Sequence, residues 1–263
     1  MEYTTLGRTG LRVSVMGLGC GGHSRLGLSY DAGEDNAEAV VRAALDLGVN
    51  IIDTAENYRT EPAVGRGTQD ARREDLVLCT KKTPVRDGAV IGPDDLRAGL
   101  EESLRRLRTD YVDVYQLHGV RPELYAQTRD ALLPSLQELR DEGKLRFLGI
   151  TELFGRDPQH SMLAQAVADG CWDVVMVGFN ILNQSARSRV LEATRAKGIG
   201  VLTMFAVRRA FSRPERLREI VSDLVQRSLI DADAVDPDDP VGFLVGEGRA
   251  GSVTEAAYRF CRH

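Results

Sequence analysis

Short apolar runs alternate with longer amphipathic stretches along most of the chain, and this alternation restricts the possible folds more than any other feature of the sequence. It is typical of β-α-β units, in which helices join parallel strands and cover the sheet that they form. Each run is short enough to be a strand buried on both faces. The seven runs that fit this description span residues 15–18, 50–53, 76–80, 111–117, 145–150, 174–177 and 200–204.

Two of the intervening stretches have the apolar spacing of helices. Residues 36–47 and 93–107 place apolar side chains three or four positions apart, so that one face of each helix would cover the sheet. Pro93, with two acidic residues directly after it, is typical of a helix start. Gly48 and Gly143 are expected to end helices.

Both ends of the chain depart from the alternation. Residues 3–6 and 11–13 flank a glycine-containing turn, which predicts a β-hairpin placed to plug one end of a barrel. Residues 213–247 combine a helix at 214–227 with an acidic, turn-rich segment, which we interpret as an inserted loop region. Because no linker or low-complexity tract divides the chain, residues 1–263 are expected to form one domain.

The number of units is one short of a closed barrel. A (β/α)8 TIM barrel has eight strand–helix units, whereas the sequence predicts seven strands, and the last helical pattern, 252–262, ends one residue before the end of the chain. An open barrel leaves unpaired backbone groups along its first and last strands. We therefore expect a (β/α)8 TIM barrel that is truncated before its eighth strand.

Charge and cysteine content argue against several other classes of protein. Lys and Arg number 34 against 39 Asp and Glu, so the net charge of −5 offers no basic excess for nucleic acid. No apolar run approaches the ~20 residues that span a bilayer, and the N-terminus lacks the pattern of a signal peptide. The cysteines are Cys20, Cys79, Cys171 and Cys261. They form no C-x-x-C pair, and this pattern favours a protein of the reducing cytoplasm.

Charged and polar side chains follow three consecutive predicted strands at their carboxyl ends. Asp53 ends the second strand, Lys81 and Lys82 follow the third, and His118 follows the fourth. The carboxyl ends of the strands form the active face of a parallel barrel. We therefore expect these side chains to meet there, together with Tyr58 from the loop after Asp53.

These residue types suit proton transfer to an oxygen atom. An ammonium group beside a phenol favours the phenolate, so Lys81 is expected to lower the pKa of Tyr58. Asp53 would balance the charge of this lysine inside the barrel, and His118 can orient or polarise a substrate oxygen. Each residue alone has an ordinary structural interpretation, but together they predict a proton-donating site beside a carbonyl group, which requires no metal.

Short motifs follow one another in a specific order along nearly the whole chain. They are LGRTGL at 6–11, GLG at 17–19, DTAENY at 53–58, TK at 80–81, DVYQLH at 113–118, GIT at 149–151 and FN at 179–180. In this order they resemble the aldo-keto reductase family. The overall pattern, including MFAVR at 204–208, is most similar to the branch of L-galactose dehydrogenase-like and related aldose dehydrogenases.

The resemblance implies a (β/α)8 barrel that binds NADPH or NADH, the reduced forms of NADP and NAD, across its carboxyl rim. Such a protein reduces a small aldehyde, ketone or aldose, or oxidises the alcohol in the reverse direction. Tyr58 matches the general acid of the family, and Asp53 and Lys81 match the pair that tunes it. His118 matches the residue that orients the carbonyl group for hydride attack. Lys82 is one position too late for this motif.

The resemblance also implies residues that contact the cofactor, with departures. Many members have Ser-Asn after the fifth strand, whereas this chain has Thr151 and Glu152, whose carboxylate can accept a hydrogen bond from the cofactor amide. Asn180 matches an asparagine after the sixth strand, while Met176 replaces a glutamine. The other residues expected near the cofactor are Met204, Phe205, Arg208 and Arg209. The two arginines suit a contact with a cofactor phosphate.

Two other functions stay open. A lysine at a strand end, here Lys81 or Lys82, is also the nucleophile of Schiff-base lyases on barrels. The second open function is a non-catalytic or redox-sensing module. In the family, the eighth strand and the helix after it hold much of the cofactor's adenosine, and this barrel is expected to lack both. The sequence selects neither the substrate, nor NADP over NAD, nor an oligomeric state.

Overall fold

A sheet of seven parallel strands forms the centre of the computed structural model, which describes residues 1–208 and 210–262. The order of neighbouring strands follows the chain, as expected for consecutive β-α-β units. All seven predicted runs contribute a strand, which confirms the barrel-type fold. The strands are β3 (Leu18–Gly19), β4 (Ile51–Asp53), β5 (Val77–Lys82), β8 (Val112–Val120), β9 (Leu145–Glu152), β10 (Val174–Gly178) and β11 (Gly200–Met204).

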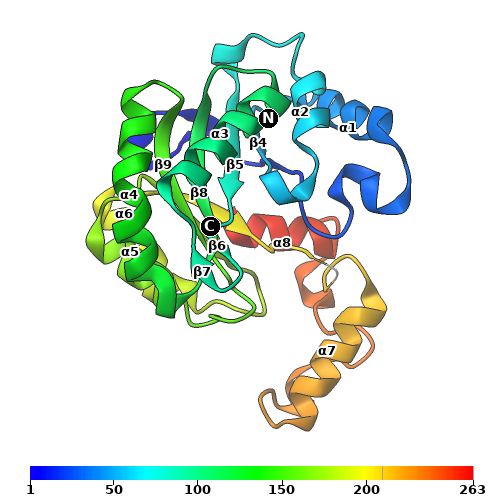
Figure 1. Cartoon of the computed structure of the whole chain (residues 1–263). Helices are drawn as coiled ribbons and strands as arrows, with labels where there is room; N and C mark the ends of the chain where they lie inside the picture. The colour runs from blue at the N-terminus through cyan, green and yellow to red at the C-terminus, as the bar shows by residue number, and fades with distance from the viewer. Residues whose placement is uncertain (209, 263) are drawn as a thin grey trace. The chain divides into compact units, whose positions relative to one another are not determined.

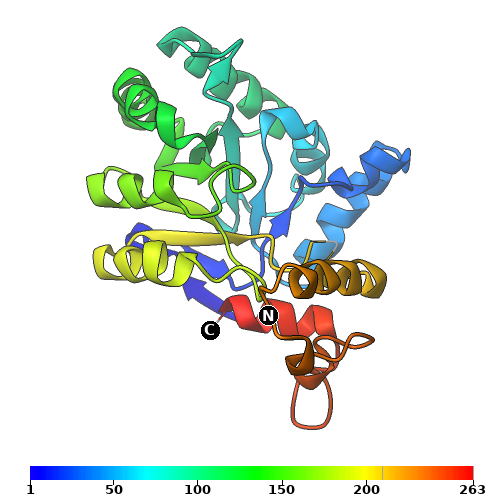
Figure 2. The same ribbon diagram turned by 90° about the horizontal axis from the view of Figure 1, so that it is seen from below.

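The sheet is curled but open. Its order runs β11-β10-β9-β8-β5-β4-β3, so β3 and β11 are the two edges, as the count of seven strands predicts. Figure 2 shows the strands curling about a common centre with the blue to yellow-green helices outside them. This arrangement brings the carboxyl ends of adjacent strands to one rim.

Six helices cover the outside of the sheet, and none of the described helices is long and apolar enough to cross a membrane. In the third helix the buried side chains Leu96, Leu100 and Leu104 lie on one face, as the apolar spacing predicts. Gly48 and Gly143 follow helices with φ of +84° and +77°. The helices are α1 (Glu34–Asp46), α2 (Glu61–Gly67), α3 (Pro93–Leu107), α4 (Tyr125–Asp141), α5 (Ser161–Asp169) and α6 (Glu192–Lys197).

The N-terminal hairpin closes the amino end of the sheet, as predicted. Its strands β1 (Tyr3–Thr5) and β2 (Arg12–Ser14) are antiparallel. Leu11 and Val13 share a buried core with residues that begin the sheet strands, such as Ile51. A second hairpin, which the sequence analysis did not predict, follows β5 and consists of β6 (Val85–Arg86) and β7 (Ala89–Val90).

The chain divides into two units. The larger one, called here the sheet unit, comprises Met1–Val177 and Arg187–Leu202, and the C-terminal unit comprises Gly178–Ala186 and the chain from Thr203 onward. The C-terminal unit contains α7 (Pro214–Gln226) and α8 (Val253–Arg262), drawn in orange and red in Figure 1. Its own apolar core consists mainly of Phe211, Leu217, Val221, Val241 and Ala257. The expectation of a single domain stays a prediction.

Candidate active site

Three adjacent strands and one loop bring the four predicted catalytic residues together. Asp53 is the last residue of β4, Lys81 lies near the end of β5, and His118 lies near the end of β8. In the register of the sheet, Lys81 is opposite Gln116 of β8. Tyr58 ends a single turn of 3-10 helix, Glu56–Tyr58, that follows β4. All four residues belong to the sheet unit.

Lys81 forms a buried ion pair with Asp53. Its side chain is fully buried, and its Nζ donates to Asp53 Oδ2 at 2.6 Å and to the Thr54 carbonyl at 2.7 Å. The second carboxylate oxygen, Oδ1, accepts a hydrogen bond from Gln116 Nε2 at 3.1 Å. Burial raises the pKa of Asp53, and the lysine and the Gln116 amide oppose this effect. Burial disfavours the ammonium form of Lys81, but the negative charge of Asp53, the hydrogen bond to it and the nearby Tyr58 and Cys79 together outweigh this effect and raise the pKa of the lysine.

Tyr58 lies between this ion pair and His118. Its hydroxyl is 3.2 Å from His118 Nε2, and the two rings meet edge to face with centroids 5.4 Å apart. Lys81 Nζ lies 5.0 Å from the centre of the phenol ring. The pKa of Tyr58 is raised by burial, and the nearby ammonium offsets this only in part. The expected lowering of the Tyr58 pKa is therefore wrong in its net direction, because burial outweighs the lysine.

His118 is a neutral imidazole in this environment. Burial and the positive charge of Lys81 lower the pKa of His118 to about 3. Its Nε2 is next to the Tyr58 hydroxyl, while its Nδ1 is buried without a hydrogen-bond partner among the described residues. Whether Nε2 donates or accepts depends on the tautomer. Near neutral pH the site thus combines a protonated phenol and an uncharged imidazole.

The neighbouring lysine points in the opposite direction. Lys82 Nζ donates to Glu56 Oε2 at 2.7 Å, and the end of its side chain lies against α3. A Cβ placed on Gly99 of that helix would be within 2.8–3.0 Å of the last three atoms of the lysine side chain. Successive side chains of a strand point to opposite faces of the sheet. Of the two lysines, only Lys81 therefore lies beside Tyr58.

The expected cofactor residues at the end of β9 have partners within the chain. Thr151 Oγ1 accepts a hydrogen bond from the Gly119 amide at 2.7 Å. Both carboxylate oxygens of Glu152 lie near Nδ1 of the buried His160, at 3.0 and 2.8 Å, and Glu152 itself is 3% exposed. Met176 pairs with Thr151 in the register of β10 and β9. Contact of Thr151 and Glu152 with a cofactor stays a prediction.

The remaining expected cofactor residues belong to the C-terminal unit. Asn180 Nδ2 donates to the Phe205 carbonyl at 3.2 Å, and the Arg208 guanidinium lies 3.7 Å from the centre of the Phe205 ring. Met204 ends β11. Arg209 is outside the described residues. A role of these residues in cofactor binding stays a prediction.

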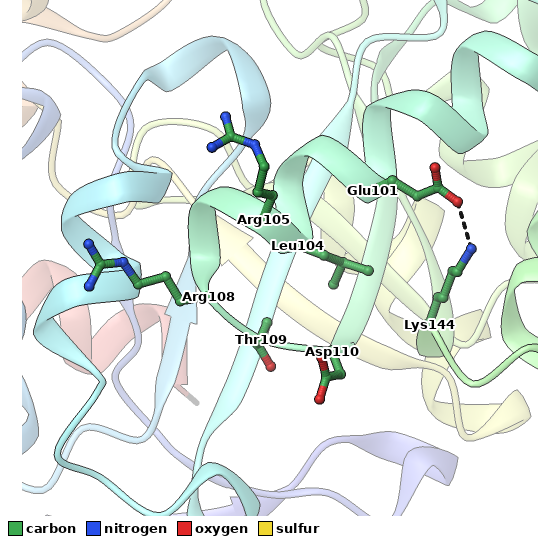
Figure 3. Close-up of a pocket in the computed structure, with 7 residues that line it drawn as sticks. All are labelled: Glu101, Leu104, Arg105, Arg108, Thr109, Asp110 and Lys144. Atoms are coloured by element: carbon green, nitrogen blue, oxygen red, sulfur yellow. Dashed lines mark hydrogen bonds and ion pairs between the residues drawn. The ribbon is translucent and has the colours of Figure 1, made fainter.

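A hollow of about 490 Å³ lies at the other end of the sheet strands (Figure 3). Its lysine and one of its arginines are paired, with Lys144 Nζ 2.6 Å from Glu101 and Arg105 bound to Glu102. It contains none of the predicted site residues. In the described part of the chain, no three His, Cys, Asp or Glu residues lie close enough together to hold a metal ion. The hollow is lined by Glu101, Leu104, Arg105, Arg108, Thr109, Asp110 and Lys144.

Two side chains that contact the predicted site residues were not predicted from the sequence. Gln116 bonds to Asp53, and His160 bonds to Glu152. A signal for Gln116 was present, because it is two residues before His118 in a strand and its side chain must point to the same face. His160 had no such signal, since a loop and not a strand brings it back to β9.

A curled parallel sheet with a phenol, a neutral imidazole and a buried Asp–Lys pair at the ends of adjacent strands defines a barrel-type protein equipped for proton transfer to an oxygen. The aldo/keto reductase family model matches residues 17–227. The chain belongs to the aldo/keto reductase family.

Individual relatives agree with this assignment. L-galactose dehydrogenase of Arabidopsis thaliana is 33% identical over 214 residues, which cover 77% of this chain and 64% of that protein. The holo form of aldo-keto reductase AKR11C1 from Bacillus halodurans matches with a TM-score of 0.64 at 27% identity, over 77% of this chain and 65% of the other. The thermostable aldo-keto reductase Tm1743 shares the fold, with a TM-score of 0.66 at 24% identity over 100% of this chain and 94% of its own.

The matches cover a smaller share of the first curated relatives than of this chain. The chain spans about two thirds of the length of the first curated relatives that it matches, 64% of the Arabidopsis enzyme and 65% of an uncharacterized oxidoreductase, YrpG, from Bacillus subtilis.

Proposed function

We propose that this protein is an NAD(P)-dependent oxidoreductase that interconverts a carbonyl group and an alcohol, with Tyr58 as the proton donor. The observation that carries the proposal is the position of the Tyr58 hydroxyl, 3.2 Å from a neutral His118 and beside the ammonium group of Lys81. The phenol is protonated near neutral pH, since the ordinary pKa of tyrosine is about 10 and burial raises the pKa of Tyr58 further. It can therefore act as a general acid toward a substrate oxygen.

Each residue has a separate part in the proton transfer. Tyr58 gives its proton to the carbonyl oxygen as negative charge develops there, and the positive charge of Lys81 stabilises the phenolate that remains. Asp53 and the Thr54 carbonyl hold the lysine in position. His118, being uncharged, contributes a hydrogen bond at the oxygen without competing as an acid. In the oxidation direction the phenolate takes the proton back.

The donor set is suited to a nicotinamide cofactor. Tyr58 provides a proton, His118 a hydrogen bond and Lys81, paired with Asp53, a positive charge. None of these side chains is a reductant, so the two electrons that reduce a carbonyl group must come from a cofactor. When bound, NADPH or NADH supplies the hydride. In the sheet unit we propose Thr151 and Glu152 as residues that contact it. For Asn180, Met204, Phe205 and Arg208 of the C-terminal unit, cofactor contact stays a prediction from the sequence, with Arg208 as a candidate for a phosphate contact.

The first test is the variant Tyr58→Phe, which keeps the ring and removes the proton. Turnover of a panel of aldehydes, ketones and aldoses should fall by about 10²–10⁴-fold, since this is the usual contribution of a general acid. Binding of NADPH and NADH, followed by fluorescence, should stay the same as in the unchanged chain. Retained turnover in this variant would rule out Tyr58 as the acid, and failure of the unchanged chain to bind either cofactor would rule out the oxidoreductase.

The other enzyme class makes a different prediction. A Schiff-base lyase needs a lysine amine that is free to attack a carbonyl carbon. Lys81 is held in an ion pair and Lys82 is bonded to Glu56 on the far side of the strand, so the geometry does not favour this class. Trapping of a substrate on the protein by borohydride would support it.

A further inference from the structure

Gly21 lies so close to the ring of Tyr58 that any larger residue would force the ring or the backbone to shift. An ideal Cβ built on Gly21 would be 2.5 Å from Cε2, 2.6 Å from Cζ and 2.9 Å from Cδ2 of the phenol. Carbon atoms that are not bonded to each other stay roughly 3.5–4.0 Å apart at their best separation. The crowded atoms include Cζ, the carbon that bears the reactive hydroxyl.

The backbone around Gly21 is held in place by the neighbouring strand. The amide of Cys20, the residue before it, donates to the Asp53 carbonyl at 2.8 Å, and Cys20 is fully buried. The turn after Asp53 then returns the chain so that Tyr58 lies over Gly21. The residue before Gly21 is therefore anchored by Asp53, which also holds Lys81.

The ring has little freedom to avoid an added methyl group. His118 meets it edge to face with centroids 5.4 Å apart, and Lys81 Nζ lies 5.0 Å from its centre. Gly21 is not among the glycines with a positive φ, so alanine at this position would not strain the backbone. The need for glycine here comes from the ring alone.

We propose that Gly21 is a positioning residue for Tyr58: its lack of a side chain lets the phenol reach His118 and Lys81. This inference rests on the proposed function of Tyr58. An added methyl group at residue 21 must move the hydroxyl away from His118 Nε2. A displacement of about 1 Å at a reacting group can lower a rate by about 10²-fold.

The chain contains a matched control two residues earlier. A Cβ on Gly19 would meet nothing within 4 Å, and the φ of Gly19 is not positive either. Gly19→Ala and Gly21→Ala therefore make the same chemical change in the same segment. Only the second of them should reach Tyr58.

The experiment compares both variants of the full chain by turnover and by nitrogen NMR of the histidine rings. The chain has four histidines, and a His118→Gln variant identifies the His118 signals. In Gly21→Ala we expect the Nε2 signal of His118 to shift and kcat to fall about 10–100-fold with KM little changed. Gly19→Ala should leave both unchanged. Equal effects in the two variants, or no effect in Gly21→Ala, would overturn the proposal.

A double-mutant cycle keeps the inference separate from the proposed activity. Thermal unfolding is compared for Gly21→Ala in the unchanged chain and in a Tyr58→Ala background. If the methyl group clashes with the phenol, Gly21→Ala lowers the melting temperature only when the ring is present. An equal loss in both backgrounds would contradict the contact. A shifted His118 signal in a chain that shows no reductase activity would support the positioning role and overturn the function of Tyr58 instead.

Discussion

Two aspartates lie in the strands of one sheet, near its opposite ends, and their surroundings differ. Asp113 near the start of β8 is fully buried, and Arg73 and the Leu78 amide donate to its Oδ2 at 2.8 and 2.9 Å. Arg146 donates to its Oδ1 at 2.7 Å. Both arginines are partly exposed, so their charges are also hydrated. Each carboxylate oxygen has a strong donor, and the cluster is complete within the chain.

Both carboxylate oxygens of Asp53 at the end of β4 also have donors, but the polar groups around it are not all paired. Its charge is balanced by Lys81, which is fully buried and has no access to water. Around this pair, Gln116 Oε1 and His118 Nδ1 are buried without hydrogen-bond partners among the described residues. Unsatisfied buried polar atoms are uncommon in folded proteins and concentrate where function requires them. The comparison supports a structural role for Asp113 and the role at a substrate site that is proposed above for Asp53.

Removing the buried lysine should have the largest effect. Lys81→Met deletes the charge that stabilises the phenolate of Tyr58, and turnover should fall by about 10³-fold, the upper range for one electrostatic contact in a transition state. It also leaves Asp53 without its cation, which should cost about 3 kcal/mol in the free energy of unfolding. Steady-state kinetics and urea unfolding measure the two effects.

A double variant separates these two roles of the lysine. Asp53→Asn combined with Lys81→Met removes both charges, so the stability should return close to that of the unchanged chain. Turnover should stay as low as in the single variant. If turnover recovered together with stability, the ion pair would be structural, and the difference from Asp113 would disappear.

Asp113→Ala should lower the free energy of unfolding and leave turnover almost unchanged, which is the opposite of the double variant. The change leaves the Leu78 amide unbonded and the two arginines without their shared carboxylate. Because the arginines can regain water, we expect a loss of about 2–3 kcal/mol in the free energy of unfolding, less than for a fully buried partner. Turnover per folded molecule, measured at a temperature where the variant is folded, should change less than about twofold. A large loss of turnover would show that both ends of the sheet affect the reaction.

The neutral state of His118 makes a prediction about pH. The pKa of His118 is about 3 in the folded chain, compared with about 6.5 when unfolded, so below pH 6.5 the unfolded chain binds a proton that the folded chain does not. The contribution of His118 to stability is therefore complete above pH 6.5 and decreases as the pH falls. Between pH 7 and 5 the unchanged chain should lose about 1–2 kcal/mol more than His118→Gln. Equal losses in urea unfolding would mean that His118 is protonated in the folded protein.

Much of the fold could be predicted because it depends on local patterns. The strand runs and the bounds of α3 follow from apolar spacing and from Pro93, and the curled parallel sheet follows from their alternation. The short hairpin β6–β7 was missed, since its two-residue strands are too short for a periodic signal. The separate core of the C-terminal unit was missed as well, because it joins side chains that are far apart in the sequence.

The proximity of the four candidate site residues was predictable, but their pKa shifts were not. Strand ends identify Asp53, Lys81 and His118, since parallel strands deliver their carboxyl ends to one rim. The net direction of the Tyr58 pKa shift depends on how deeply the ring is buried, which no local pattern reveals. The contact of Gly21 with Tyr58 and that of His160 with Glu152 likewise depend on how loops fold back.

Lys82 provides the smallest and most selective test of the comparison. It differs from Lys81 by one position, yet it lies on the other face of β5, where 17% of its side chain is exposed and Glu56 is its partner. A partly exposed ion pair contributes at most about 1 kcal/mol, so Lys82→Met should change the free energy of unfolding by less than this. Turnover should stay within about twofold of the unchanged chain, in contrast to the loss of about 10³-fold expected for Lys81→Met. If Lys82→Met abolished turnover instead, the reacting lysine would be on the outer face of the strand, and the site assigned around Asp53 would be wrong.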